Sequence, residues 1–184
     1  MASGVHQPMA WTGVDRDTEL RTARLWLRGF RHDDVDDALA YRDDREFARY
    51  LPHIPQPFTR ADADAFVARN IDEPWATLPT FAVVLADHVV GTVNLEIDPV
   101  HGVAMLGYGL ARAHWGRGLA TEAAAAVVAW TFATHELIAI WASTHADNLR
   151  SQRVLAKLGM TPDPATGTER RYWLRRPAAS RAAR

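Results

Sequence analysis

The sequence predicts one α/β domain built on a mixed, mostly antiparallel sheet, and three observations lead to this class. Short runs that alternate apolar and polar residues, as strands do, are interspersed with runs whose apolar residues recur every three or four positions, as in helices. The strand-like runs 81–85, 89–97 and 103–110 follow one another with only short turns between them, which favours antiparallel pairing. The expected order is strand, helix, helix, three strands, helix, strand, helix, strand.

Length and composition fit this class. The chain has 184 residues, of which 48% are hydrophobic and 23% charged, as in ordinary globular domains. A net charge of -1 gives no overall attraction to nucleic acid or to a membrane surface, so we expect neither as a partner. The absence of cysteine excludes disulfides and thiolate sites and is compatible with the cytoplasmic location that we expect. The eight histidines are scattered without metal-ligand spacing, so no metal site is predicted.

The first half of the domain holds a strand and two helices. We expect residues 1–20 to be a flexible lead-in and residues 21–176 to form the domain. The alternation in residues 23–28 predicts a strand, and the stripe at 35–42 predicts a helix that begins after acidic residues. Three prolines between 51 and 57 predict a loop.

The remaining elements follow in order. Thr59, followed three residues later by an acidic residue, predicts a capped helix. After the three consecutive strands come a helix from Leu119 to Thr134, a strand at 138–144 and a helix that Gly159 ends. The glycines of the third strand, Gly107 and Gly109, predict a bulge or a close backbone approach. A last strand covers 170–174, and we expect 177–184 to be a disordered basic tail.

The turn at 114–122 is the strongest candidate for a binding site. Gly116 and Gly118 allow the backbone to turn sharply just before a helix, whose first N–H groups have no intrahelical acceptor. Such a helix start favours a phosphate or pyrophosphate, and Arg117 lies within reach to add a charge-assisted contact. A simple turn is the alternative. A Rossmann site is disfavoured because Thr121 stands where a third glycine is needed.

Four stretches in this order resemble the GNAT superfamily of acyl-CoA-dependent N-acyltransferases. Within it the chain most resembles the Rim-type branch, which contains the ribosomal-protein N-terminal acetyltransferases. The resemblance covers roughly residues 22–174, although Trp115 replaces the arginine or glutamine with which the phosphate loop of the superfamily usually begins. The matching stretches are 22–28, 106–110, 115–123 and 148–160.

The resemblance implies a GNAT fold with about four helices and a sheet splayed between its fourth and fifth strands. It also implies acetyl-CoA as the cofactor, with its pantetheine arm in the splay and its pyrophosphate on the loop. Ser151 would donate a proton to the departing thiolate, unless it is simply a solvent-exposed serine. Asn148 would contact the pantetheine arm, or would only cap its helix. The implied cofactor-binding residues are Leu110, Ala111, Arg117, Gly118, Leu119, Ala120, Thr121, Asn148 and Ser151.

The proton acceptor is not indicated as clearly. An attacking amine must be neutral, yet the central strand lacks the glutamate that serves many superfamily members. Glu96, on the neighbouring strand, is the best substitute, with Asn94 on the same face and His145 as second choice. Tyr108 is interpreted as a core or pocket-wall residue, and Glu122 as structural.

The sequence therefore predicts an acetyl-CoA-dependent N-acetyltransferase. The acceptor would be a primary amine, on a protein N-terminus or a small molecule, that attacks the thioester directly. A homodimer is plausible from the branch. The alternative is a non-catalytic acyl-CoA-binding sensor or interaction module.

Overall fold

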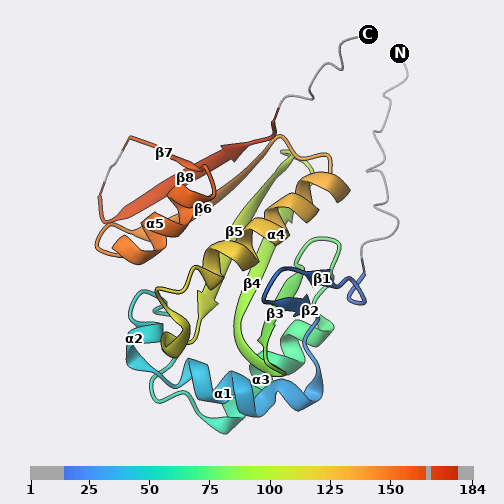
Figure 1. The fold of residues 1–184 in the computed structure, drawn as a ribbon, viewed down its shortest axis with the longest axis vertical. Helices are drawn as coiled ribbons and strands as arrows, with labels where there is room; N and C mark the ends of the chain where they lie inside the picture. Colours follow the sequence, from blue (N-terminus) through green and yellow to red (C-terminus); the bar gives the residue numbers. More distant parts are fainter. Residues whose placement is uncertain (1–14, 165–166, 178–184) are drawn as a thin grey trace, which may run out of the picture.

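An eight-stranded sheet runs through the domain in the computed structural model, which describes residues 15–164 and 167–177 (Figure 1). The strand order is β1-β2-β3-β4-β5-β6-β8-β7. All neighbours pair antiparallel except β5 and β6, which pair parallel. The sheet is therefore mixed and mostly antiparallel, as predicted. The strands are β1 (Leu20–Arg21), β2 (Trp26–Arg28), β3 (Thr80–Leu85), β4 (His88–Asp98), β5 (Val103–Leu110), β6 (Ala139–His145), β7 (Thr161–Pro162) and β8 (Glu169–Arg175).

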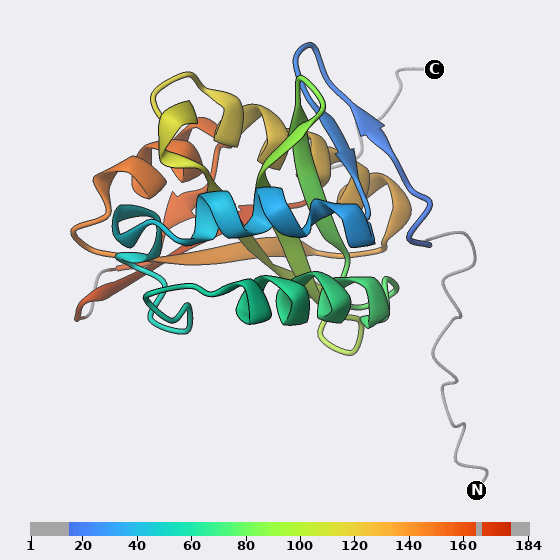
Figure 2. The same ribbon diagram turned by 90° about the horizontal axis from the view of Figure 1, so that it is seen from below.

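Helices cover both faces of the sheet, and Figure 2 shows α3 and α4 on opposite sides of it. Helix α4 packs on β4 and β5, and α5 lies against β6, whereas α1 packs on α3 and β4. The helices are α1 (Val35–Arg42), α2 (Arg45–Ala48), α3 (Arg60–Asp72), α4 (Leu119–Thr134) and α5 (Leu149–Lys157), with 3-10 turns at η1 (His32–Asp34) and η2 (Arg112–His114).

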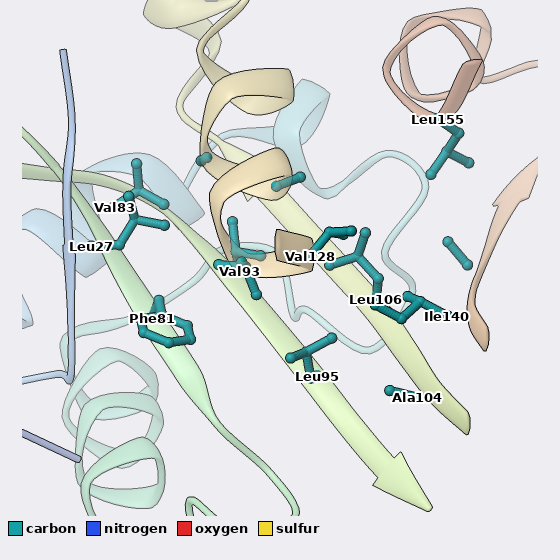
Figure 3. Close-up of a cluster of buried hydrophobic side chains, with 14 of the residues drawn as sticks. Leu27, Phe81, Val83, Val93, Leu95, Ala104, Leu106, Val128, Ile140 and Leu155 are labelled. Carbon is teal, nitrogen blue, oxygen red and sulfur yellow. The ribbon is translucent and has the colours of Figure 1, made fainter. Parts of the chain in front are cut away.

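The main core lies between the sheet and α4. Alternate side chains of β3, β4 and β5 point into it, and Figure 3 shows Phe81, Val93 and Leu106 among them, with Leu155 of α5 at one side. The intervening residues of β3, Ala82 and Val84, point the other way into a second cluster with α1 and α3. This two-faced alternation makes the register of the central strands specific, because a one-residue slip would exchange the two cores.

Local sequence signals explain where several elements begin. The Thr59 side chain accepts from the N–H of Asp62, whose carboxylate in turn accepts from the Thr59 N–H, so the predicted cap of α3 is present. Ala86 and Asp87 both have positive φ and form the tight turn between β3 and β4. Helix α4 has the predicted bounds, Leu119–Thr134.

Three short elements were not predicted. These are α2, with four residues, and the two-residue strands β1 and β7. The predicted strand at 23–28 is shorter than expected, because only Trp26–Arg28 pairs with β3. Of the expected lead-in, residues 1–14 lie outside the described residues, and Leu20 belongs to β1, where it pairs with Leu27. Of the expected tail, residues 178–184 lie outside the described residues as well.

The sequence offered a bulge or a close approach for the glycines of β5, and the close approach is what the structure shows. The pairing of β4 with β5 runs without a shift from Val103 to Leu110, so a bulge in this strand is wrong. The register shift lies instead in β3, between Val83 and Val84. A Cβ at Gly107 would come within 2.5 Å of the Asn94 side-chain oxygen, so a side chain there would displace the Asn94 amide.

Strands β5 and β6 separate soon after they meet. They pair only over three positions, the last joining Met105 to Trp141, although β5 continues to Leu110 and β6 to His145. The predicted splay of the sheet is therefore confirmed (Figure 1).

The backbone groups that face this gap follow from the pairing pattern. Ala111 donates its N–H to the Val90 carbonyl on the β4 side, and bonded pairs alternate along an antiparallel ladder. Tyr108 and Leu110 must then turn their N–H and C=O groups away from β4, toward the gap. These groups lie beyond the last position at which β6 could pair with them.

Candidate active site

The loop at the end of β5 presents unpaired backbone donors. Gly116 and Gly118 have φ of +74° and +77°, values that residues with a side chain rarely adopt. Gly118 is the N-cap of α4, and because glycine has no side chain it cannot cap the first N–H groups of the helix. The first helical bond runs from the Glu122 N–H to the Gly118 carbonyl, so the N–H groups of residues 119–121 have no acceptor within the helix. This arrangement suits an anion.

Hydrogen bonds of Arg24 and Glu122 hold the loop at 115–118 in place. Arg24 donates from Nη1 to the Arg117 carbonyl at 2.9 Å and from Nε to Glu122 at 2.7 Å. Thr22 donates to the other Glu122 oxygen at 2.6 Å. Burial alone would raise the pKa of Glu122, but these hydrogen bonds and the Arg24 charge lower it below its ordinary value of 4.5. Glu122 is therefore structural, and it joins the first strands to the loop.

Trp115 joins the loop to the end of β5 and to α5. Its indole Nε1 donates to the Leu110 carbonyl at 2.7 Å, and the Arg150 guanidinium lies 4.6 Å from its ring centroid. These two contacts of the Trp115 side chain connect the loop to both neighbouring elements. The Leu110 carbonyl already accepts from Trp115, and the Ala111 N–H is bonded to Val90, so of these predicted pantetheine contacts the Leu110 N–H is the group that stays open toward the gap.

Two cations near the loop have no acidic partner. Within the described ranges no carboxylate forms an ion pair with Arg117 or Arg150, whereas Arg112 is paired with Asp44 at 2.8 Å. Arg117 instead lies 3.1 Å from His114 Nδ1. Burial and the Arg117 charge both lower the pKa of His114, which favours the neutral imidazole. Arg117 and Arg150 are therefore available to a phosphorylated ligand.

Ser151 lies in the first turn of α5, and its side-chain partner is Tyr108. The Asn148 side-chain oxygen accepts from the Ser151 N–H at 3.2 Å, so Asn148 caps this helix. The Tyr108 hydroxyl lies 2.8 Å from Ser151 Oγ. The sequence did not predict this pair. The available signal was that Tyr108 alternates with Leu106 and Leu110, which point toward the α4 side of the sheet.

The two candidate bases lie at opposite ends of the gap, and the structure does not bring them together. Glu96 is exposed beside Met105, at the last paired position, on the face opposite α4. His145, at the far end of β6, is stacked on Tyr50 with ring centroids 5.3 Å apart. Its Nδ1 accepts from the Asp147 N–H at 3.1 Å, so the lone pair that a base needs is already in use there.

Neither a metal site nor a membrane span is found in the part of the chain that the structure describes. Residues 15–164 and 167–177 hold no group of three or more potential metal ligands. None of the helices there combines the length and apolar character needed to cross a membrane.

Comparison with known families decides the class of this site. The profile of the acetyltransferase (GNAT) domain family matches residues 24–161, which include the gap, the loop at 115–118 and α5. The chain belongs to the GNAT family. It is thus an acetyltransferase, and the predicted family, fold and enzyme class are confirmed.

Individual GNAT proteins are similar to this chain in sequence and in fold. The uncharacterized N-acetyltransferase p20 of Bacillus licheniformis is 30% identical over 142 residues, which cover 76% of this chain and 80% of p20. A GNAT acetyltransferase from Bacillus anthracis superposes with a TM-score of 0.75 at 24% identity, covering 86% of this chain and 98% of that one.

A Rim-type enzyme shares the fold as well. RimL, a ribosomal L7/L12 alpha-N-protein acetyltransferase whose structure was solved in complex with coenzyme A, superposes with a TM-score of 0.72. The identity is 15%, and the match covers 84% of this chain and 95% of RimL. The predicted Rim-type resemblance is therefore present in the fold.

Replacing Glu122 tests the anchoring of the loop. Because the folded-state pKa of Glu122 is lowered, its carboxylate stabilises the protein above its unfolded-state pKa, and this contribution is lost as the pH falls through the folded-state value. At neutral pH Glu122→Gln is expected to lower the free energy of unfolding by about 1–2 kcal/mol.

Chemical denaturation at about pH 7 and about pH 3 measures the free energy of unfolding of the wild-type and Glu122→Gln proteins. The difference should shrink at the lower pH. Glu136→Gln is the control, because Glu136 is exposed and should leave stability unchanged. A loss for Glu122→Gln that is equally large at both pH values would contradict the role of the carboxylate charge.

Proposed function

We propose that this GNAT protein transfers the acetyl group of acetyl-CoA to a primary amine, on a protein N-terminus or a small molecule. The observation that supports this most strongly is the position of the α4 N-terminus. Its unpaired N–H groups stand at the end of β5, beside the gap between β5 and β6. A molecule that carries a pyrophosphate on a long amide-containing arm matches both features at once.

The cofactor would be held mainly by backbone. The N–H groups of Leu119, Ala120 and Thr121 would bind the pyrophosphate, with Arg117 adding a charge-assisted contact. The pantetheine arm would lie in the gap and bond to Tyr108 and Leu110 like an added strand. The residues around the gap fit this group, because they offer donors and acceptors without strand partners.

The reaction would be a direct transfer. The amine nitrogen attacks the thioester carbon, a nitrogen–carbon bond forms, and the carbon–sulfur bond breaks with its electron pair leaving on sulfur. Ser151 donates its hydroxyl proton to that sulfur and regains a proton from solvent. The chain has no cysteine, so no acyl intermediate on a thiol of the protein arises.

Glu96 is the proposed acceptor of the amine proton. It lies on the sheet face opposite α4, and the acceptor would enter from that face. It is also next to the position where β5 and β6 separate. Asn94 shares that face and would orient an intervening water. His145 is less suited because of its bond to the Asp147 N–H.

The test of the function is release of free thiol from acetyl-CoA in the presence of a panel of peptides and small amines. An N-acetyltransferase releases thiol in proportion to the acetylated amine, which mass spectrometry identifies. An acyl-CoA sensor would bind the cofactor, in a calorimetric titration, without release of thiol with any amine. That result would remove the transferase activity and leave only the binding site.

Replacing Gly118 tests the cradle. A valine there would be forced into positive φ and would place a branched side chain among the phosphate-binding N–H groups. Gly118→Val is expected to weaken acetyl-CoA binding by at least about tenfold in calorimetry, equivalent to about 1.4 kcal/mol.

Gly167→Val is the matched control, because Gly167 has a similar φ of +80° but lies between β7 and β8, away from the loop. Its affinity for acetyl-CoA should equal that of the wild-type protein. Equal affinity of a folded Gly118→Val protein would show that the loop does not hold the cofactor.

Replacing the candidate bases separates their roles. If Glu96 accepts the proton, Glu96→Gln should lower kcat by about a hundredfold. His145→Gln should change kcat by less than about threefold in the same assay. The reverse pattern would assign the base to His145, against this proposal.

A further inference from the structure

Tyr108 and Ser151 form a hydroxyl pair beside the gap. Tyr108 comes from β5, and Ser151 comes from the first turn of α5, 43 positions later in the chain. Their hydroxyl oxygens lie 2.8 Å apart, and the Tyr108 hydroxyl also donates to the Ser151 carbonyl oxygen at 3.1 Å. Both side chains are partly buried, so the pair is shielded from bulk water.

Ser151 is held in place on its backbone. The Asn148 side chain bonds to the Ser151 N–H, and Arg150, the residue before Ser151, lies against the ring of Trp115 in the phosphate loop. The remaining freedom of Ser151 is mainly rotation of its side chain and of its hydroxyl proton. Tyr108 is the residue that touches this hydroxyl.

The direction of the hydrogen bond decides what Ser151 can do. If Ser151 donates to Tyr108, its proton is occupied and is not offered to a ligand. If Tyr108 turns its one proton from the Ser151 carbonyl to Ser151 Oγ, which is the nearer acceptor, the Ser151 proton is free to point into the gap. A developing thiolate is a stronger acceptor than a phenol oxygen, so charge on sulfur favours the second direction. Donation by Tyr108 also polarises the Ser151 hydroxyl and makes it a better donor.

We propose that Tyr108 is a positioning residue that donates its hydrogen bond to Ser151 Oγ and so directs the Ser151 proton toward the departing sulfur. This inference rests on the proposed acetyl transfer. Tyr108 keeps its own proton throughout, and the proton balance of the reaction is unchanged.

The environment of Tyr108 agrees with a permanent donor. Burial raises its pKa to about 12, although the hydrogen bond with Ser151 acts in the opposite direction. The phenol therefore stays protonated at neutral pH. A tyrosine that served as the base would need the opposite shift.

The test is a double-mutant cycle with Tyr108→Phe and Ser151→Ala, measured by thiol release with the best amine of the panel. Tyr108→Phe should lower kcat about tenfold and leave the KM for acetyl-CoA within about twofold of the wild-type value. In the Ser151→Ala background, the same change should lower kcat no further, because Tyr108 acts through the serine hydroxyl.

Tyr41→Phe is the matched control. Tyr41 is a buried tyrosine of α1, 4% exposed, whose hydroxyl lies 2.7 Å from Thr92 Oγ1 in the second core cluster. Its substitution removes the same atom, and kcat should stay at the wild-type value. Thermal unfolding of each variant verifies that the fold is kept.

The outcomes are distinct. Wild-type kcat in a folded Tyr108→Phe protein would overturn the inference, while the wild-type turnover in that assay would uphold the proposed function. An equal loss in the Ser151→Ala background would show that Tyr108 acts independently of Ser151, which also overturns it. A wild-type protein that releases no thiol with any amine would remove the proposed function and this inference together.

Discussion

Strands β5 and β6 stop pairing after three positions although both continue, and most of the site depends on this separation. Backbone groups at the end of β5 are left without a strand partner inside a folded domain, where unpaired polar groups are costly. The protein supplies one partner itself, the Trp115 indole on the Leu110 carbonyl. The other groups are open to a ligand that can bond like a strand.

The loop at 115–118 leads to a second set of open backbone groups, which suit an anion. Its donors are backbone N–H groups at the start of α4, fixed by two glycines with positive φ. Arg24 and Glu122 hold the loop from the side of the first strands through hydrogen bonds within the protein. A site that is formed before binding loses less conformational entropy when the ligand enters.

The sequence predicted the parts of the fold that depend on local signals. The bounds of α4, the cap of α3 and the β3–β4 turn follow from glycines, capping residues and apolar spacing within short windows. The very short elements α2, β1 and β7 were missed because two to four residues contain no period to detect. The bulge in β5 was wrong, because Gly107 lies in regular pairing and instead leaves room for the side chain of Asn94 on the next strand.

Contacts between distant segments were beyond local reasoning. Nothing near Tyr108 in the sequence indicates that its hydroxyl meets Ser151, because the splay and the placement of α5 create that contact. The same holds for Trp115, which replaces the usual loop residue and here bonds to the end of β5.

The most direct test of the account is a crystal structure of the protein with acetyl-CoA. The account predicts pyrophosphate oxygens within about 3 Å of the N–H groups of residues 119–121. It also predicts the pantetheine arm between β5 and β6 and the sulfur beside Ser151. Acetyl-CoA bound elsewhere, with the α4 N-terminus and the gap unoccupied, would contradict it.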